Sequence, residues 1–170
     1  MNSYTAENNQ VPEMQQNLEL LKNVHLFASF PGKAMKLLAF LAARVHLASG
    51  DVLFEQGDDR GEGYLIVTGQ LHLKRLSSDK EIVVQRYAPG DFLGFCTLLG
   101  AMPALFTLQA ATETTILTIN RKQFSKILEQ FPETAKLSLK ALLNELHQWE
   151  RKNIYEAGAC CLSRTGVTVL

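Results

Sequence analysis

The sequence predicts an α+β fold, in which helices precede and follow a barrel or sandwich of short antiparallel strands. Between about Val45 and Asn120, short apolar runs alternate with Gly-containing turns, which is typical of such a barrel. On either side of this region the apolar residues recur at helical spacing. The 170 residues, 46% hydrophobic and 20% charged, suffice for one domain with its own core.

The N-terminal part is expected to hold a leader and two helices. Residues 1–17 are rich in Asn and Gln and show no periodicity, so we predict a mobile leader. Apolar residues from Leu18 to Phe30 predict a first short helix. Pro31 opens a second helix, in which Met35 and Leu38 recur at near-helical spacing. The folded domain is therefore expected over residues 18–157.

The strands are expected where apolar runs end at turn residues. In the segment 71–76, Leu71 and Leu73 share one face while His72 and Lys74 share the other, an alternation that suits a sheet with one solvated side. The predicted strand segments are 45–48, 52–56, 64–67, 71–76, 82–87, 106–110 and 115–119.

After Asn120 the spacing becomes helical. One apolar stripe runs from Phe124 to Phe131, and Pro132 is expected to start a new helix, where proline is tolerated in the first turn. The second helix carries a heptad-like seam, which predicts a helix partner. Its residues are Ala135, Leu139, Leu142, Leu146 and Trp149. This seam either forms a homodimer or packs on the domain's own barrel. Residues 158–170 are expected to be a flexible tail.

Charge and cysteine content limit the partners and the cellular compartment that the sequence predicts. The 17 basic and 17 acidic side chains balance, so no basic field predicts nucleic-acid binding by this chain alone. The pairs Lys74 with Arg75, and Arg121 with Lys122, are interpreted as ordinary surface. No apolar run reaches the roughly 20 residues of a membrane helix, and no secretory leader is evident. Three cysteines form no disulfide framework, so we predict a cytoplasmic protein.

Four segments that end at or contain glycine turns identify the fold more specifically than the general α+β pattern does. The segments 52–58, 64–71, 88–94 and 117–124, in this order, resemble the cyclic-nucleotide-binding domain family of catabolite-activator and FNR-type regulators and protein kinase A regulatory subunits. The resemblance implies an antiparallel β-roll, a double-stranded jelly-roll barrel, flanked by N-terminal helices and a long C-terminal helix. It also implies that residues 88–94 lead into the phosphate-binding cassette of the family.

The resemblance locates the ligand site in the cassette, and this chain departs from the family pattern there. Members that bind cyclic nucleotide place a Glu just after the cassette Gly and an Arg about ten residues later, where charge-assisted hydrogen bonds hold the ligand. Phe95 and Ala104 occupy these two positions. The candidate ligand-site residues are Gly94, Phe95, Cys96, Thr97, Ala104, Leu105, Phe106 and Thr107.

Losing both charged contacts would weaken a micromolar site beyond millimolar, because each contact to a buried anion is worth on the order of 2–5 kcal/mol. No basic residue near Met102 is expected to substitute for the missing Arg. Either Phe95, Leu105 and Phe106 fill the cavity, or they line an apolar cavity for a less polar ligand.

We therefore expect a stand-alone regulatory domain, degenerate for cAMP and cGMP, that acts through a protein partner or another ligand. Two alternatives remain: a cyclic-nucleotide sensor with non-standard contacts, and the sensor half of a transcription regulator whose DNA-binding part is absent. No catalytic motif is present, so no enzymatic activity is expected. Neither a cofactor nor a metal site is expected, since the four histidines show no metal-type spacing.

Overall fold

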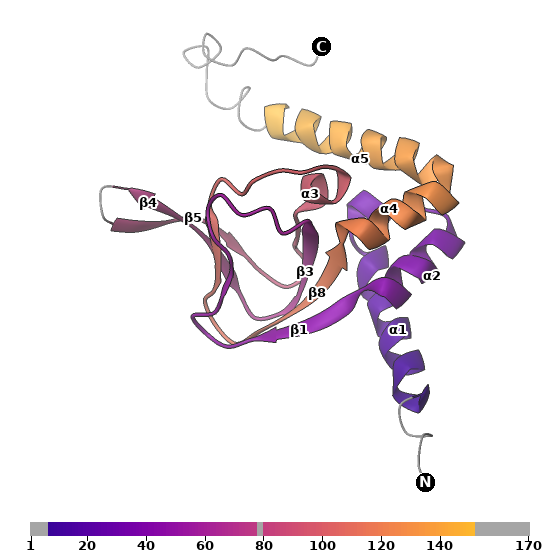
Figure 1. Cartoon of the computed structure of the whole chain (residues 1–170), viewed down its shortest axis with the longest axis horizontal. Coiled ribbons are helices and arrows are strands. Elements are labelled where there is room, and N and C mark those ends of the chain that lie inside the picture. Colours follow the sequence, from indigo (N-terminus) through magenta and orange to yellow (C-terminus); the bar gives the residue numbers. More distant parts are fainter. Residues whose placement is uncertain (1–6, 78–79, 152–170) are drawn as a thin grey trace.

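Two four-stranded antiparallel sheets form the body of the protein and helices cover one end of it (Figure 1). The computed structural model describes residues 7–77 and 80–151. One sheet has the strand order β1-β8-β3-β6 and the other β2-β7-β4-β5. The strands are β1 (Ala43–Leu47), β2 (Val52–Phe54), β3 (Glu62–Thr68), β4 (Leu71–Ser77), β5 (Lys80–Tyr87), β6 (Phe92–Leu93), β7 (Thr107–Ala110) and β8 (Thr114–Asn120). This arrangement confirms the predicted jelly-roll class.

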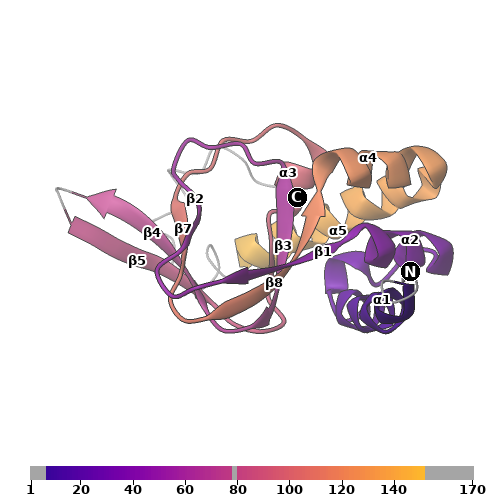
Figure 2. The same ribbon diagram turned by 60° about the horizontal axis from the view of Figure 1, so that its bottom comes forward.

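The helices gather at the end of the roll opposite the β4–β5 hairpin, which projects away from the body in both views (Figure 2). The N-terminal layer comprises α1 (Glu7–Lys22), a 3-10 turn η1 (His25–Phe27) and α2 (Gly32–Leu41). The cassette contributes α3 (Phe95–Leu99), and the roll is followed by α4 (Arg121–Gln130) and α5 (Pro132–Glu150). As predicted, Pro132 occupies the first turn of the last helix.

The predicted leader differs from the structure, because α1 begins at Glu7 and takes in most of residues 1–17. Its polar sequence has no apolar period, so periodicity alone could not indicate a helix. The same helix continues into Leu18 and Leu21, which are buried in the core. Hydrogen bonds add to this packing: the buried Asn17 side chain accepts from Nε of Arg44 at 2.9 Å, and Gln16 accepts from the same guanidinium. The predicted tail, residues 158–170, lies outside the described residues, as do Cys160 and Cys161.

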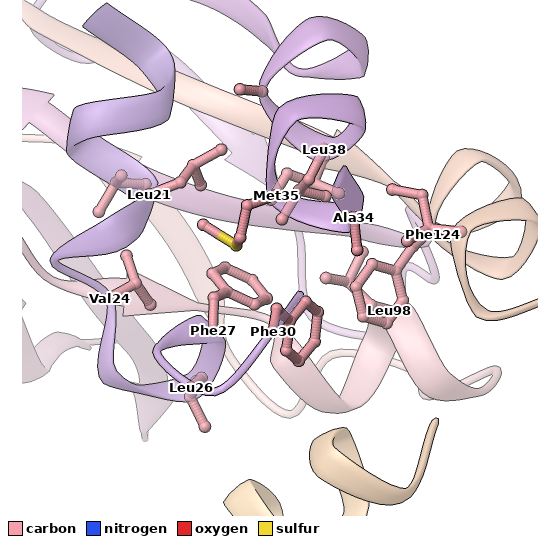
Figure 3. Packing of buried hydrophobic residues seen from close by; sticks show 14 of the residues in the cluster. Leu21, Val24, Leu26, Phe27, Phe30, Ala34, Met35, Leu38, Leu98 and Phe124 are labelled. Carbon is pink, nitrogen blue, oxygen red and sulfur yellow. The ribbon is translucent and has the colours of Figure 1, made fainter. Parts of the chain in front are cut away.

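The hydrophobic core has two parts. A smaller cluster fills the roll between the sheets and includes Ile66, Leu71 and Leu108. A larger cluster joins the helices to the outer face of β3 and β8. Its centre is Phe27, whose ring lies 5.4 Å from that of Phe30 and 6.4 Å from that of Phe124 (Figure 3).

Candidate functional site

The cassette begins at Gly94, which connects β6 to α3. Gly94 has φ of +81°, in the left-handed region that favours glycine. A Cβ here would lie 2.6 Å from the carbonyl oxygen of Glu62 on β3, so the backbones approach too closely for any side chain. The tight junction fixes the direction of α3 against β3.

Phe95 points away from the roll interior and into the helical core. It is 6% exposed, and its ring lies 5.8 Å from the Phe27 ring and 6.2 Å from the Phe124 ring. Leu98, one turn later, joins the same cluster (Figure 3). The hypothesis that Phe95 fills or lines the ligand cavity is therefore wrong, because its ring gains more apolar contact between η1 and α4.

Thr97 is the α3 side chain that faces the cavity. Its hydroxyl lies 2.7 Å from the carbonyl oxygens of both Glu62 and Gly94, so it ties the cassette helix to β3. Cys96 is a free, half-buried thiol that does not line the cavity.

An open cavity of about 50 Å³ lies beside Gly94, inside the end of the roll. Eleven residues line it: Phe54, Asp58, Arg60, Gly61, Glu62, Tyr64, Leu93, Gly94, Thr97, Met102 and Ala104. Of the eight candidate residues from the sequence, three therefore reach the cavity, namely Gly94, Thr97 and Ala104.

Ala104 is fixed at the cavity by backbone pairing with the β2–β3 loop. Its carbonyl accepts from the Gly57 N–H at 2.8 Å, and its own N–H donates to the Asp58 carbonyl at 2.8 Å. The next residue, Leu105, is 75% exposed and cannot fill the cavity. The filling hypothesis is therefore wrong for Leu105 as well.

Phe106 is half-buried and does not line the cavity. Thr107 lies on β7, where its hydroxyl accepts from the Gln56 N–H at 3.1 Å. Phe106 directly precedes β7, and neither residue reaches the space beside Gly94.

Polar residues from β2–β3 make one wall of the cavity, and the sequence did not indicate them. The Tyr64 hydroxyl donates to Oε2 of Glu62 at 3.0 Å. Burial and then the Glu62 charge raise the pKa of Tyr64 above its ordinary value, so its phenol stays neutral. Glu62 and Tyr64 are two residues apart on β3, so their side chains lie on the same face of the strand. This spacing is the only feature of the sequence that could have predicted their contact.

Arg60 is the one basic residue among the eleven that line the cavity, and the sequence did not indicate it. Its guanidinium is not free, because Nε and Nη2 both donate to the Leu53 carbonyl, at 3.0 and 2.5 Å. A loop arginine of this kind looks like ordinary surface in the sequence. Only the folding of the β2–β3 loop against the cassette brings it to the cavity.

Arg121, interpreted from the sequence as surface, joins three segments at the cavity mouth. Its backbone N–H donates to the Gly61 carbonyl at 2.7 Å, and its guanidinium donates to both carboxylate oxygens of Asp59 and to the Thr97 carbonyl. The hydrogen bond from Arg121 lowers the pKa of Asp59. The first residue of α4 is thereby bonded to the cassette helix and to the cavity loop.

The last helix presents an apolar stripe to solvent that differs from the predicted seam at one position. Leu142 packs on the helical core, and Leu143 takes its place in the exposed stripe. The exposed apolar side chains of α5 are Leu139, Leu143, Leu146 and Trp149, and Ala135 is exposed on the preceding turn. On its inner side, α5 buries Thr134 and Ser138.

In residues 7–77 and 80–151, no three His, Cys, Asp or Glu side chains gather as metal ligands. Within the same ranges, no helix has the length and apolar character needed to cross a membrane.

Comparison with known proteins matches the roll and cassette to one family. A family model described as "Cyclic nucleotide-binding domain" matches residues 44–131. The cAMP-dependent protein kinase type II regulatory subunit of Drosophila melanogaster is 30% identical over 82% of the chain, which spans 38% of that protein.

Solved structures are similar as well, and two of them compare as follows in identity and coverage. A cyclic nucleotide-binding-like protein from Brucella abortus is 33% identical, with a TM-score of 0.62, over 67% of this chain and 98% of that one. The N-terminal domain of a transcriptional regulator from Streptomyces coelicolor A3(2) is 28% identical, with a TM-score of 0.70, over 78% and 94% of the two chains.

Proposed function

The chain belongs to the cyclic nucleotide-binding domain family, and from this premise we propose that it is a regulatory domain that does not retain cAMP or cGMP at cellular concentrations. One observation carries the proposal. The position from which the family pattern would present a phosphate-binding Arg is Ala104, whose side chain lines the cavity and offers no charge. The position next to Gly94, where the family pattern has an acidic residue, is Phe95, and its side chain is buried in the helical core.

The electrostatics of the cavity support the same proposal. Two carboxylates, Asp58 and Glu62, and one guanidinium, Arg60, line it, so the formal charge of its wall is negative. A cyclic phosphate would meet two like charges without a dedicated partner. Repulsion of this kind adds to the loss of the charged hydrogen bonds.

A second candidate function, a cyclic-nucleotide sensor with non-standard contacts, is favoured by one observation only. Arg60 stands at the cavity and would have to leave the Leu53 carbonyl to reach a phosphate.

Both candidate functions are regulatory rather than catalytic. None of the eleven cavity-lining residues is a Ser, Cys or His. The free thiol of Cys96 suits the cytoplasm, where we place the protein.

The route of regulation that we propose runs from the cavity to the last helices. Phe95 and Leu98 of α3 share one cluster with Phe124 of α4, so a displacement of the cassette changes the packing of α4. Arg121 adds a polar connection between the same elements. A ligand or partner that moves the cassette thereby changes the position of α5.

Calorimetric titration with cAMP and cGMP to about 1 mM tests the proposal. We expect no saturable heat with the wild-type chain and a gain of binding in Ala104→Arg, which returns the charge at the cavity. Leu105→Arg is the matched control, because it adds the same charge one residue away on an exposed side chain. Saturable binding by the wild-type chain that is lost in Arg60→Ala would establish the sensor instead.

We further propose that the partner of α5 is a second copy of the chain. Leu139, Leu143 and Leu146 repeat at four and three residues, the spacing of a self-pairing helical seam. Light scattering after gel filtration should show a dimer that becomes monomeric in Leu143→Glu. The exposed change Lys140→Glu on the same helix should leave the dimer intact. A monomeric wild-type chain would refute the homodimer and leave a different protein as the partner.

A further inference from the structure

The cavity wall offers carboxylate acceptors and carries more negative than positive charge. Oε2 of Glu62 accepts from Tyr64, while Oε1 receives no hydrogen bond from any residue in the described part of the chain. Asp58 accepts the Glu55 N–H at 3.1 Å through one oxygen. An ionised carboxylate only accepts, so a ligand that meets these oxygens must bring a donor.

The two hydroxyl donors of the wall are already engaged, and so are two N–H groups of Arg60. The Tyr64 hydroxyl donates to Glu62, and the Thr97 hydroxyl is within bonding distance of two backbone carbonyls. Arg60 directs Nε and Nη2 to the single carbonyl oxygen of Leu53, which holds its positive charge at the edge of the cavity. With two carboxylates against one guanidinium, the net charge of the wall is opposite in sign to that of a site for phosphate.

Aromatic and aliphatic surfaces form the rest of the wall. The rings of Phe54 and Tyr64 stack at 6.0 Å with an angle of 28° between them, and Leu93 and Met102 complete the apolar side. Aromatic faces attract cations as well as apolar groups. A volume of about 50 Å³ suits a head group, and the body of a ligand would extend past Met102, which is half exposed in a segment without regular structure.

We propose that this cavity binds the protonated amino group of a small organic amine, with Glu62 as its counter-charge and the Phe54 and Tyr64 rings beside the ammonium group and the carbon atom that carries it. This inference rests on the proposed function, because a retained cyclic-phosphate site would need a positive wall in the same place. Glu62 is then the specificity-determining residue: it accepts the ammonium hydrogen bonds and repels an anion of the same shape.

Three ligands with the same ring and different charge test the inference: benzylamine, benzyl alcohol and benzoate. Titrations followed by heteronuclear NMR should show benzylamine binding about tenfold or more tightly than benzoate, with the alcohol in between. Glu62→Gln should remove the difference between amine and benzoate. Glu55→Gln is the matched control, since it removes the same charge from a neighbouring residue outside the cavity wall.

Two results would overturn the amine site. One is benzoate binding as tightly as benzylamine, or no shift of cavity resonances with benzylamine up to about 10 mM. The other is an amine preference that persists in Glu62→Gln. Adding cAMP to the same series separates the two proposals: cAMP binding by the wild-type chain contradicts the proposed function, whereas the order of the three ring ligands tests only the amine site.

Discussion

Restoring an acidic residue beside Gly94 would follow the family pattern, but the structure predicts that Phe95→Glu unfolds much of the protein. Phe95 is nearly buried between Phe27 and Phe124. Truncating a buried Phe costs about 3–5 kcal/mol. An unpaired carboxylate in that place would shift its pKa upward by about 2–3 units, which adds about 3–4 kcal/mol at neutral pH. The sum, about 6 kcal/mol or more, approaches the whole stability of many domains.

Urea unfolding followed by circular dichroism measures this loss. The introduced Glu would have a folded-state pKa above its unfolded value, so its contribution is least unfavourable at low pH and worsens as pH rises through the folded pKa. The stability gap between Phe95→Glu and wild type should therefore widen from about pH 4 to about pH 7. Ala104→Arg, at an open cavity wall, should lose less than about 1 kcal/mol. Wild-type stability in Phe95→Glu, together with cAMP binding, would refute the placement of Phe95 in the helical core.

Three further outcomes follow from the geometry of the cassette and its neighbours. Gly94→Ala should destabilise the domain by at least about 1 kcal/mol in the same assay, because it combines positive φ with a Cβ close to the Glu62 carbonyl; unchanged stability would mean that the junction relaxes freely. The pKa of Asp59 is lowered in the folded state, so its contribution is present above the unfolded pKa and is lost as pH falls through the folded one. Asp59→Asn should accordingly be less stable than wild type at neutral pH, and the two unfolding curves should converge in acid; a constant difference would contradict the pairing with Arg121. Asn120→Ala should cost about 1 kcal/mol, since the Asn120 side chain accepts from the Lys122 N–H as the N-cap of α4, and Gln123→Ala inside the helix serves as the control.

Much of the fold could be predicted because its signals are local. The alternation of Leu71 and Leu73 with polar neighbours set the faces of β4, and Pro132 marked the boundary between two helices. The turn carboxylates act over equally short distances in the sequence: Asp91 accepts the Ala88 N–H, and Asp58 accepts that of Glu55. Each of these features, the strand face, the helix boundary and the turn hydrogen bond, depends on residues within a few positions of one another. A short stretch of sequence is therefore enough to predict it.

The candidate site was harder to predict because its residues meet through tertiary structure. The five residues of α3 are too few to show a helical period, so the sequence could not tell whether Phe95 or Thr97 faces the roll. Arg60 and Arg121 are 61 positions apart, and each resembles a surface residue in isolation. Their roles come from the β2–β3 loop, which carries Arg60 to the cavity and Asp59 to Arg121.

The division of the core into two clusters has a consequence for amide hydrogen exchange. Phe95 and Leu98 pack α3 into the larger cluster, which the helices form. The strands around the cavity pack instead on the smaller cluster inside the roll. Amides of α3 should therefore gain and lose protection together with those of α2 and α4, not with those of β4 and β7. The boundary between two exchange units then lies at Gly94, which itself lines the cavity, so a bound ligand contacts the place where the two units meet.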